Sequence, residues 1–159
     1  MADYGTVEGV AEIASTWTRG GEFFDEDEIY SIAPTNPPLS TVEAWITTMT
    51  AIMDAALKDN YFVTPLTDTY AVSYAAVVNQ CNTLVADLIA ARNQQGRFFL
   101  QTVDVSRDLS NWMKIQTELI AWVKGNVETF LAEGVPQITT NQIRAGQIAV
   151  ILQDDEFDD

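Results

Sequence analysis

Histidine is absent from this chain of 159 residues, and cysteine occurs once, at Cys81. Without histidine, no Ser-His or Cys-His pair can activate a nucleophile, and no imidazole can bind zinc or haem. A single cysteine also excludes an intrachain disulfide and a cysteine-rich zinc site. These absences exclude enzymes whose nucleophile is activated by histidine, and zinc or haem proteins whose metal is held by histidine or by several cysteines.

Basic residues are scarce as well. Eight Lys and Arg stand against 23 Asp and Glu, which gives a net charge of −15. Surfaces that bind duplex DNA or anionic membranes need basic side chains to neutralise phosphates. No run of about 18 apolar residues predicts a membrane span, and no basic, apolar signal segment opens the chain. We therefore expect a protein that is made and kept in the cytosol or assembled from there.

The acidic excess is concentrated at the two ends of the sequence. Residues 1–28 contain eight acids and one base, and residues 154–159 contain five acids and no base. Residues 29–153 are close to neutral, at −3. Apolar residues make up 47% of the chain, which is too many for an acidic disordered tail and enough for the core of one domain.

Three segments are predicted to be amphipathic helices, because their apolar residues recur every three or four positions. They cover about residues 40–58, 68–94 and 106–133. Helices of this length joined by short connectors favour an all-α fold, a small bundle of three main helices. Cys81 falls on the apolar face of the second helix, where we expect an inert core thiol.

Signals for the helix ends accompany this pattern. Ser40 and Glu43 have the spacing of a capping box, and Asp68 is a suitable N-cap for the second helix. Gly125 and Asn126 are weak helix formers within the third segment, so a kink is expected there.

The remaining segments predict arms outside the bundle. Residues 6–14 have the spacing of a short helix, and short β elements are expected near 97–105 and 138–152. We divide the chain into a helical domain with an acidic N-terminal segment, residues 1–134, and an extended C-terminal arm with an acidic tail, residues 135–159. Apolar arms on a small core need a partner surface, which favours an oligomer.

No group of residues predicts an active site. The acidic run 25–28 lacks the alternating ligands and the glycine of a calcium loop, and no glycine-rich phosphate loop follows a strand. We expect a structural or interaction protein rather than an enzyme, with no metal and no cofactor. A metal- or ligand-binding enzyme that uses only carboxylates stays open as an alternative, although general bases near neutrality are missing.

The order of features resembles that of the head–tail connector proteins of tailed bacteriophages, also called adaptor or head-completion proteins. The resemblance rests on Ile32-Ala33-Pro34, on a helix containing residues 42–46 and 52–57, on the turn Asn60–Pro65, and on a long helix starting near Asp68. It covers residues 29–95 and includes the third helix only by architecture. The acidic N-terminal extension and the last 25 residues depart from the family pattern.

This resemblance implies a ring, typically of twelve subunits, beneath the portal of the filled capsid. The ring extends the DNA channel and offers a docking surface to the next neck protein, a stopper or tail-completion protein. The protein would thus be found in the virion, at the head–tail interface, after assembly from the host cytoplasm. Members of the family have no catalytic residues. Their terminal arm reaches the portal, which here implies the apolar residues of the C-terminal arm: Ile138, Ile143, Ile148, Val150, Ile151, Leu152 and Phe157.

A channel wall must let DNA slide without binding it, and carboxylates repel phosphates. We therefore expect acids of the N-terminal segment to face the lumen of such a ring: Glu22, Asp25, Glu26, Asp27 and Glu28. The alternative is an acidic DNA mimic that inhibits a host DNA-binding enzyme. A mimic needs carboxylates spaced regularly over a folded face, whereas ten of the 23 acids cluster within residues 22–28 and 154–159.

Overall fold

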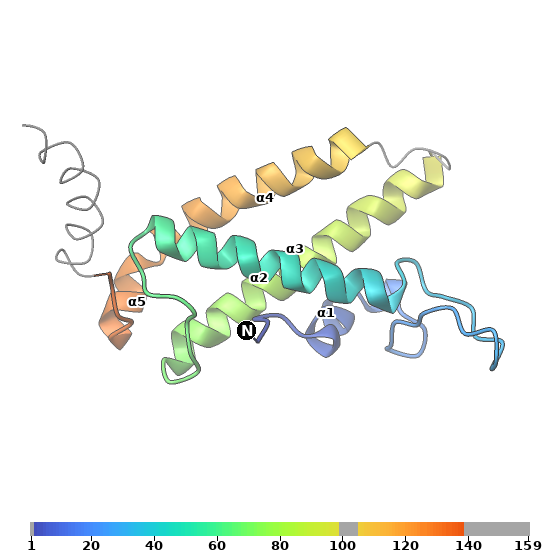
Figure 1. Cartoon of the computed structure of the whole chain (residues 1–159), viewed down its shortest axis with the longest axis horizontal. Helices are drawn as coiled ribbons and strands as arrows, with labels where there is room; N and C mark the ends of the chain where they lie inside the picture. Colours follow the sequence, from blue (N-terminus) through green and yellow to red (C-terminus); the bar gives the residue numbers. More distant parts are fainter. Residues whose placement is uncertain (1, 99–104, 139–159) are drawn as a thin grey trace, which may run out of the picture.

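The structure is a computed structural model that describes residues 2–98 and 105–138 (Figure 1). Within these ranges the fold is all-α, as predicted, and β pairing is limited to isolated bridges. No helix in the described part is long and apolar enough to cross a membrane. The helical elements are α1 (Val7–Ile13), the 3-10 turn η1 (Ser15–Trp17), α2 (Leu39–Asp59), α3 (Ala71–Phe98), α4 (Val105–Gly125) and α5 (Val127–Glu133).

Helix α2 occupies the centre of the molecule and packs against both α3 and α4 (Figure 1). Helix α1 packs mainly on α3 and also contacts α2, while α5 contacts α3 and α4. The core therefore receives side chains from every α-helix. The largest fully buried ones are Phe62, Phe130, Met49, Met53, Leu57, Ile89, Leu119, Val10, Val42, Val77, Val85 and Val123.

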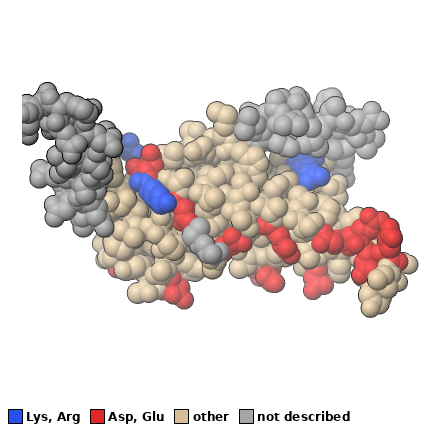
Figure 2. Space-filling model, viewed as in Figure 1, with Lys and Arg blue, Asp and Glu red and all other residues tan. Residues whose placement is uncertain are grey.

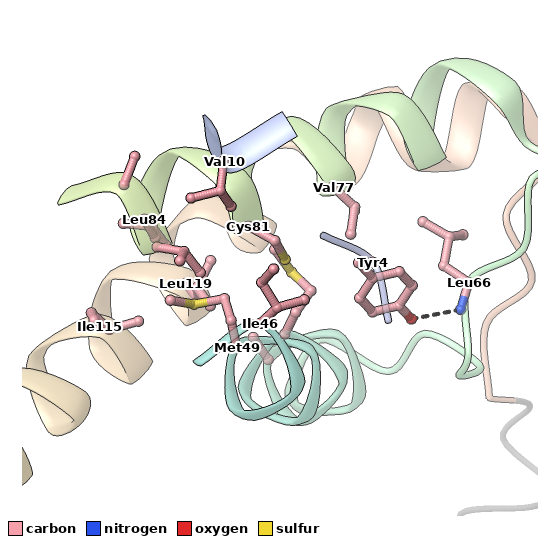
Figure 3. Close-up of a cluster of buried hydrophobic side chains, with 14 of the residues drawn as sticks. Tyr4, Val10, Ile46, Met49, Leu66, Val77, Cys81, Leu84, Ile115 and Leu119 are labelled. Atoms are coloured by element: carbon pink, nitrogen blue, oxygen red, sulfur yellow. Dashed lines mark hydrogen bonds between the residues drawn. The ribbon is translucent and has the colours of Figure 1, made fainter. Parts of the chain in front are cut away.

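Cys81 lies in the middle of this core, as predicted. Figure 3 shows its sulfur among Val10 of α1, Ile46 and Met49 of α2, and Leu119 of α4. The thiol is 1% exposed, and burial raises its pKa to about 12. A thiol that stays protonated at neutral pH is a poor nucleophile.

The predicted third helix is broken in two. Helix α4 ends at Gly125 and α5 begins at Val127, with Asn126 between them at φ −111° and ψ 8°. The Asn126 side chain donates a hydrogen bond to the Trp122 carbonyl oxygen at 2.7 Å, which satisfies an acceptor at the end of α4. The predicted kink is thus a complete break, and a single helix over 106–133 is wrong. Gly134 ends α5 at φ 89°, a left-handed conformation that glycine adopts without steric cost.

Both predicted helix caps are wrong, because carboxylates from distant segments take their place. Helix α2 starts one residue before Ser40, and the Ser40 N–H donates to the Asp25 carboxylate at 2.9 Å. Helix α3 begins at Ala71 rather than after Asp68. Its Val72 and Ser73 N–H groups donate to the two oxygens of Glu133 at 2.9 and 2.7 Å. A carboxylate satisfies unpaired N–H groups and complements the positive end of the helix dipole.

Replacing Asp25 with alanine is expected to lower the free energy of unfolding by about 1 kcal/mol, the usual effect of losing an N-terminal cap. Urea unfolding followed by circular dichroism measures this change. The matched control is Glu26→Ala, which removes the neighbouring exposed carboxylate and should change stability by less than about 0.5 kcal/mol. Equal losses in the two variants would contradict the assignment of Asp25 as the cap of α2.

The N-terminal segment is part of the core and not an extended arm. The short helix expected at 6–14 is present as α1, where the Thr6 hydroxyl accepts a hydrogen bond from the Gly9 N–H at 3.0 Å. Tyr4, before the helix, and Val10, within it, are 2% and 0% exposed. The Thr6 N–H also donates to the Asn82 side chain of α3 at 3.0 Å. The apolar face of α1 was visible in the sequence, but its packing partner was not.

The β elements expected near 97–105 and 138–152 are not present where the structure describes these ranges. Helix α3 continues through Phe98 and α4 already includes Val105, while residues 99–104 and 139–152 lie outside the described residues. In the part of these ranges and their flanks that the structure describes, pairing is limited to a bridge between Gln137 and Phe62.

The first residues of the predicted C-terminal arm belong to the core. Val135 is 3% exposed, the Val63 N–H donates to the Pro136 carbonyl at 3.0 Å, and the Ile138 N–H donates to the Tyr61 carbonyl at 2.7 Å. Of the apolar residues proposed to contact a portal, only Ile138 lies in the described part of the chain, where it is half-buried. The rest lie outside it: Ile143, Ile148, Val150, Ile151, Leu152 and Phe157.

Candidate functional site

Residues 24–35 form a hairpin that projects beyond the first turn of α2, drawn in light blue at the right of Figure 1. Asp27 and Ile32 exchange both backbone hydrogen bonds, at 3.0 and 2.8 Å. At the base, the Thr35 N–H donates to the Phe24 carbonyl at 3.0 Å, and the Phe24 N–H donates to the Thr35 hydroxyl at 2.9 Å. Because Asp25 also caps α2, the hairpin is fixed at its base.

The tip of the hairpin presents two large apolar side chains to solvent. The Asp27 carboxylate accepts hydrogen bonds from the N–H groups of Ile29 and Tyr30 at 3.0 and 3.3 Å, which shapes the turn. Ser31 completes it at φ 54°. Ile29 is 86% exposed and Tyr30 is 75% exposed. These two neighbouring side chains are therefore accessible to a partner at the end of the projection.

The acids predicted to form a functional surface all lie on this hairpin or at its root. Glu22, Asp25, Glu26 and Glu28 are exposed, and Asp27 is half-buried. Two of the five have a structural role that the sequence did not predict, because Asp25 caps α2 and Asp27 holds the turn. Figure 2 shows Asp and Glu gathered on the projecting segment at the right and along the lower edge of the visible face.

A pocket of about 410 Å³ lies at the base of the hairpin. Its apolar lining comes from three segments: Val7 and Ala11 of α1, Phe23 and Phe24 at the start of the hairpin, and Leu39 of α2. Carboxylates from the same three segments also line it: Glu8, Glu22 and Glu43. Only Glu22 was a candidate in the sequence. Nothing in the local pattern indicated the pocket, since it forms where three separate segments of the chain, residues 7–11, 21–24 and 39–43, meet.

A second group of buried polar atoms surrounds the Tyr4 hydroxyl, between the N-terminal segment, α2 and the α2–α3 connector. The Tyr4 hydroxyl donates to the Asp54 carboxylate at 2.5 Å and accepts from the Leu66 N–H at 2.8 Å (the Leu66 contact is dashed in Figure 3). Asp54 is 6% exposed. Burial and the hydrogen bond to Asp54 raise the pKa of Tyr4 well above its ordinary value. This network ties the N-terminus to α2 and to the α2–α3 connector.

Stability is expected to fall at alkaline pH because the pKa values of Cys81 and Tyr4 are raised in the folded state. The pKa values in the unfolded chain are about 9 for cysteine and 10 for tyrosine. Below them both groups are protonated in the folded and the unfolded state, so their titration does not lower the free energy of unfolding. Above these values the unfolded chain releases its protons first. For each group the free energy of unfolding then falls by about 1.4 kcal/mol per pH unit, until the pH reaches the pKa of that group in the folded state.

Urea unfolding between pH 8 and pH 10.5, run on the parent chain and on Cys81→Ala, measures this loss. The variant is expected to be less stable at pH 8 because of the cavity, but to lose less stability with rising pH. A parent chain whose unfolding free energy stays constant over this range would contradict the burial of the thiol.

Within residues 2–98 and 105–138, no group of three or more Cys, Asp or Glu side chains is arranged to hold a metal ion. Comparisons with protein-family models, with curated proteins and with solved structures find no match to this chain. In the described part of the chain, the candidate functional site is therefore identified from the structure alone. It consists of the projecting hairpin with its exposed tip and of the acidic pocket at the base of the hairpin.

Proposed function

We propose that this chain is a structural virion protein that forms a ring between the portal and the tail or neck of a tailed bacteriophage. The ring, typically twelve-fold in such proteins, extends the DNA channel and offers a docking surface to a stopper or tail-completion protein. DNA passes through it without specific binding, and the chain catalyses no reaction. In this proposal α2, α3 and α4 are the main helices of the bundle.

The observation that supports the proposal most is the unit formed by α2, its connector and α3, which contains the residues on which the resemblance depends. The two helices pack against each other, and the connector between them is anchored by Phe62, which is fully buried, and by Leu66, which is 4% exposed. The segment Tyr61–Val63 also forms backbone hydrogen bonds with Pro136 and Ile138, in the chain that follows α5. The order of helix, turn and helix on which the resemblance rests thus corresponds to two packed helices with a buried connector between them.

The acidic hairpin supports the proposed channel surface. Glu26 and Glu28 are exposed on a projection that is fixed at its base, so their charge has a defined position relative to the bundle. In a ring, a carboxylate-bearing projection repeated in every subunit would repel the phosphates of passing DNA.

Light scattering coupled to size-exclusion chromatography tests the proposal on the purified chain, alone and mixed with the portal of the same phage. A mass that is a fixed multiple of 17.6 kDa, either alone or bound to the portal, is the expected result. A chain of 17.6 kDa in both samples, with no portal-bound fraction, would contradict it.

A truncation separates the portal contact from the fold. The C-terminal arm is proposed to reach the portal, and Val135 to Ile138 pack on the connector, so the cut belongs after Ile138 rather than after Gly134. The chain ending at Ile138 is expected to keep its helical circular-dichroism spectrum and to lose co-sedimentation with the portal. Retained binding would contradict the role of the arm. A second cut after Gly134 is the comparison and should also lower the thermal midpoint.

An acidic DNA mimic remains the second candidate, favoured by one observation. Several predicted acids lie on a folded projection, and the visible face carries Asp and Glu along one edge (Figure 2). A mimic would displace duplex DNA from a host DNA-binding enzyme, and competition measured by fluorescence anisotropy would detect this. Displacement by the chain without any ring or portal binding would favour the mimic over the connector.

A further inference from the structure

The pocket at the base of the hairpin combines an apolar floor with an acidic rim. Val7, Ala11 and Leu39 contribute aliphatic surface, and Phe24 contributes an aromatic ring. Its volume, about 410 Å³, falls within the range of pockets that bind small ligands or a partner's side chains. A surface of this kind can bury one large apolar side chain, which is how a few anchor residues dominate many interfaces.

The charge around the pocket selects the kind of partner. Glu8, Glu22 and Glu43 are exposed carboxylates on three different segments, and none of the residues that line the pocket is basic. The hairpin adds the four acids of residues 25–28 directly beyond Phe24. Complementary potentials between two surfaces guide their association and exclude partners of the same charge.

Phe24 already engages a cation on its ring. The guanidinium carbon of Arg19 lies 4.8 Å from the ring centroid, and this side chain also donates to the carbonyl oxygen of Ala33. The contact is a cation–π interaction, and it keeps Arg19 at the hairpin base rather than among the residues that line the pocket. Arg19 thus packs on the Phe24 ring, and the carboxylates of Glu8, Glu22 and Glu43 have no basic neighbour among the residues that line the pocket.

We propose that this pocket is a docking site for a segment of another protein that carries one apolar anchor side chain next to Lys or Arg. A second copy of this chain inserting its hairpin tip is disfavoured, because Ile29 and Tyr30 follow four acids that would approach the acidic rim. The tip instead gives the basic partner a second apolar contact beyond the pocket. The proposal does not depend on ring formation or on a portal, and so it goes beyond the function proposed above.

The test uses short synthetic peptides and the full chain labelled with ¹⁵N. One peptide has a central phenylalanine flanked by lysines, and its matched partner has glutamates in place of the lysines. The lysine peptide is expected to shift the amide signals of Val7, Ala11, Gly21 and Leu39, and its affinity should fall by about tenfold between low salt and roughly 0.5 M salt because the charges are screened. The glutamate peptide should cause no shifts.

A variant with three substitutions tests whether the carboxylates around the pocket bind the lysine peptide. The combined variant Glu8→Gln, Glu22→Gln and Glu43→Gln is expected to bind the lysine peptide at least about tenfold more weakly, as the loss of three attractive charges predicts. The control is Glu128→Gln, which neutralises an exposed carboxylate on α5 and should bind as the parent does. The circular-dichroism spectrum and the thermal midpoint verify that both variants fold.

Several results would overturn the proposal. These are no shift at millimolar peptide, equal binding of the two peptides, shifts confined to residues outside the pocket, or unchanged affinity in the folded triple variant. None of these results bears on whether the chain forms a ring, and a failure to form rings leaves the peptide assay unaffected. The two proposals can thus fail separately.

Discussion

Replacing Phe130 with alanine is expected to lower the free energy of unfolding by about 3–5 kcal/mol, the range for deleting a buried aromatic side chain. Phe130 is 0% exposed and packs edge-to-face on two other rings. The ring of Phe62 lies 5.4 Å away at 79°, and that of Trp122 lies 6.1 Å away at 63°. The substitution would open a cavity where α5, the end of α4 and the α2–α3 connector meet. Urea unfolding monitored by tryptophan fluorescence measures the loss.

The matched control is Leu131→Ala on the same helix. Leu131 is 45% exposed, and alanine favours the helix, so its unfolding free energy should change by less than about 0.5–1 kcal/mol. A loss at Phe130 no larger than that at Leu131 would mean that α5 does not pack as described. Because the Val135 N–H donates to the Phe130 carbonyl at 3.0 Å, the start of the C-terminal arm should lose protection from hydrogen exchange in Phe130→Ala.

Replacing Tyr4 is expected to release the N-terminal segment from the core. Tyr4→Ala removes a ring that is 2% exposed and should cost about 3–5 kcal/mol, as for other buried aromatics. Tyr4→Phe keeps the ring but leaves the buried Asp54 carboxylate and the Leu66 N–H without the hydroxyl they share, which should cost about 1–3 kcal/mol. Thermal and urea unfolding give both values.

A double-mutant cycle separates the hydrogen bond from the packing. Asp54→Asn is combined with Tyr4→Phe, and because the two groups are in direct contact, the losses should be non-additive by about 0.5–3 kcal/mol. Tyr61→Phe is the control, since Tyr61 is 57% exposed and its hydroxyl has no comparable buried partner among the described residues. A Tyr4→Phe variant as stable as Tyr61→Phe would contradict the buried network.

The helices were predictable where a long apolar stripe runs along one face. The predicted bounds of the first helix, 40–58, differ from those of α2 by one residue at each end, and the break at Gly125 and Asn126 was visible as weak helix propensity. The caps were not predictable. Asp25 and Glu133 are 15 and about 60 residues from the N–H groups that they satisfy, so no local spacing indicates them.

The candidate site was predictable only in part, for a similar reason. The acids of the N-terminal segment were identified from composition, because their density is high over a short range. Their placement on a fixed hairpin depends on pairing between Phe24 and Thr35 and between Asp27 and Ile32. The pocket requires α1 to fold back on α2 and α3, and the short periodic segment at 6–14 gave no sign of where it would pack. Contacts between segments that lie far apart in the sequence could therefore not be predicted, even where the residue types involved were recognised.

The central claim is that this chain builds a ring around a DNA channel. Electron microscopy of the purified chain, imaged alone and together with the portal of the same phage, tests it most directly. If the chain forms this ring, the class averages will show annular particles with a central opening, either free or stacked coaxially on the portal. Particles that stay monomeric in both samples, with the portal unoccupied, would contradict it.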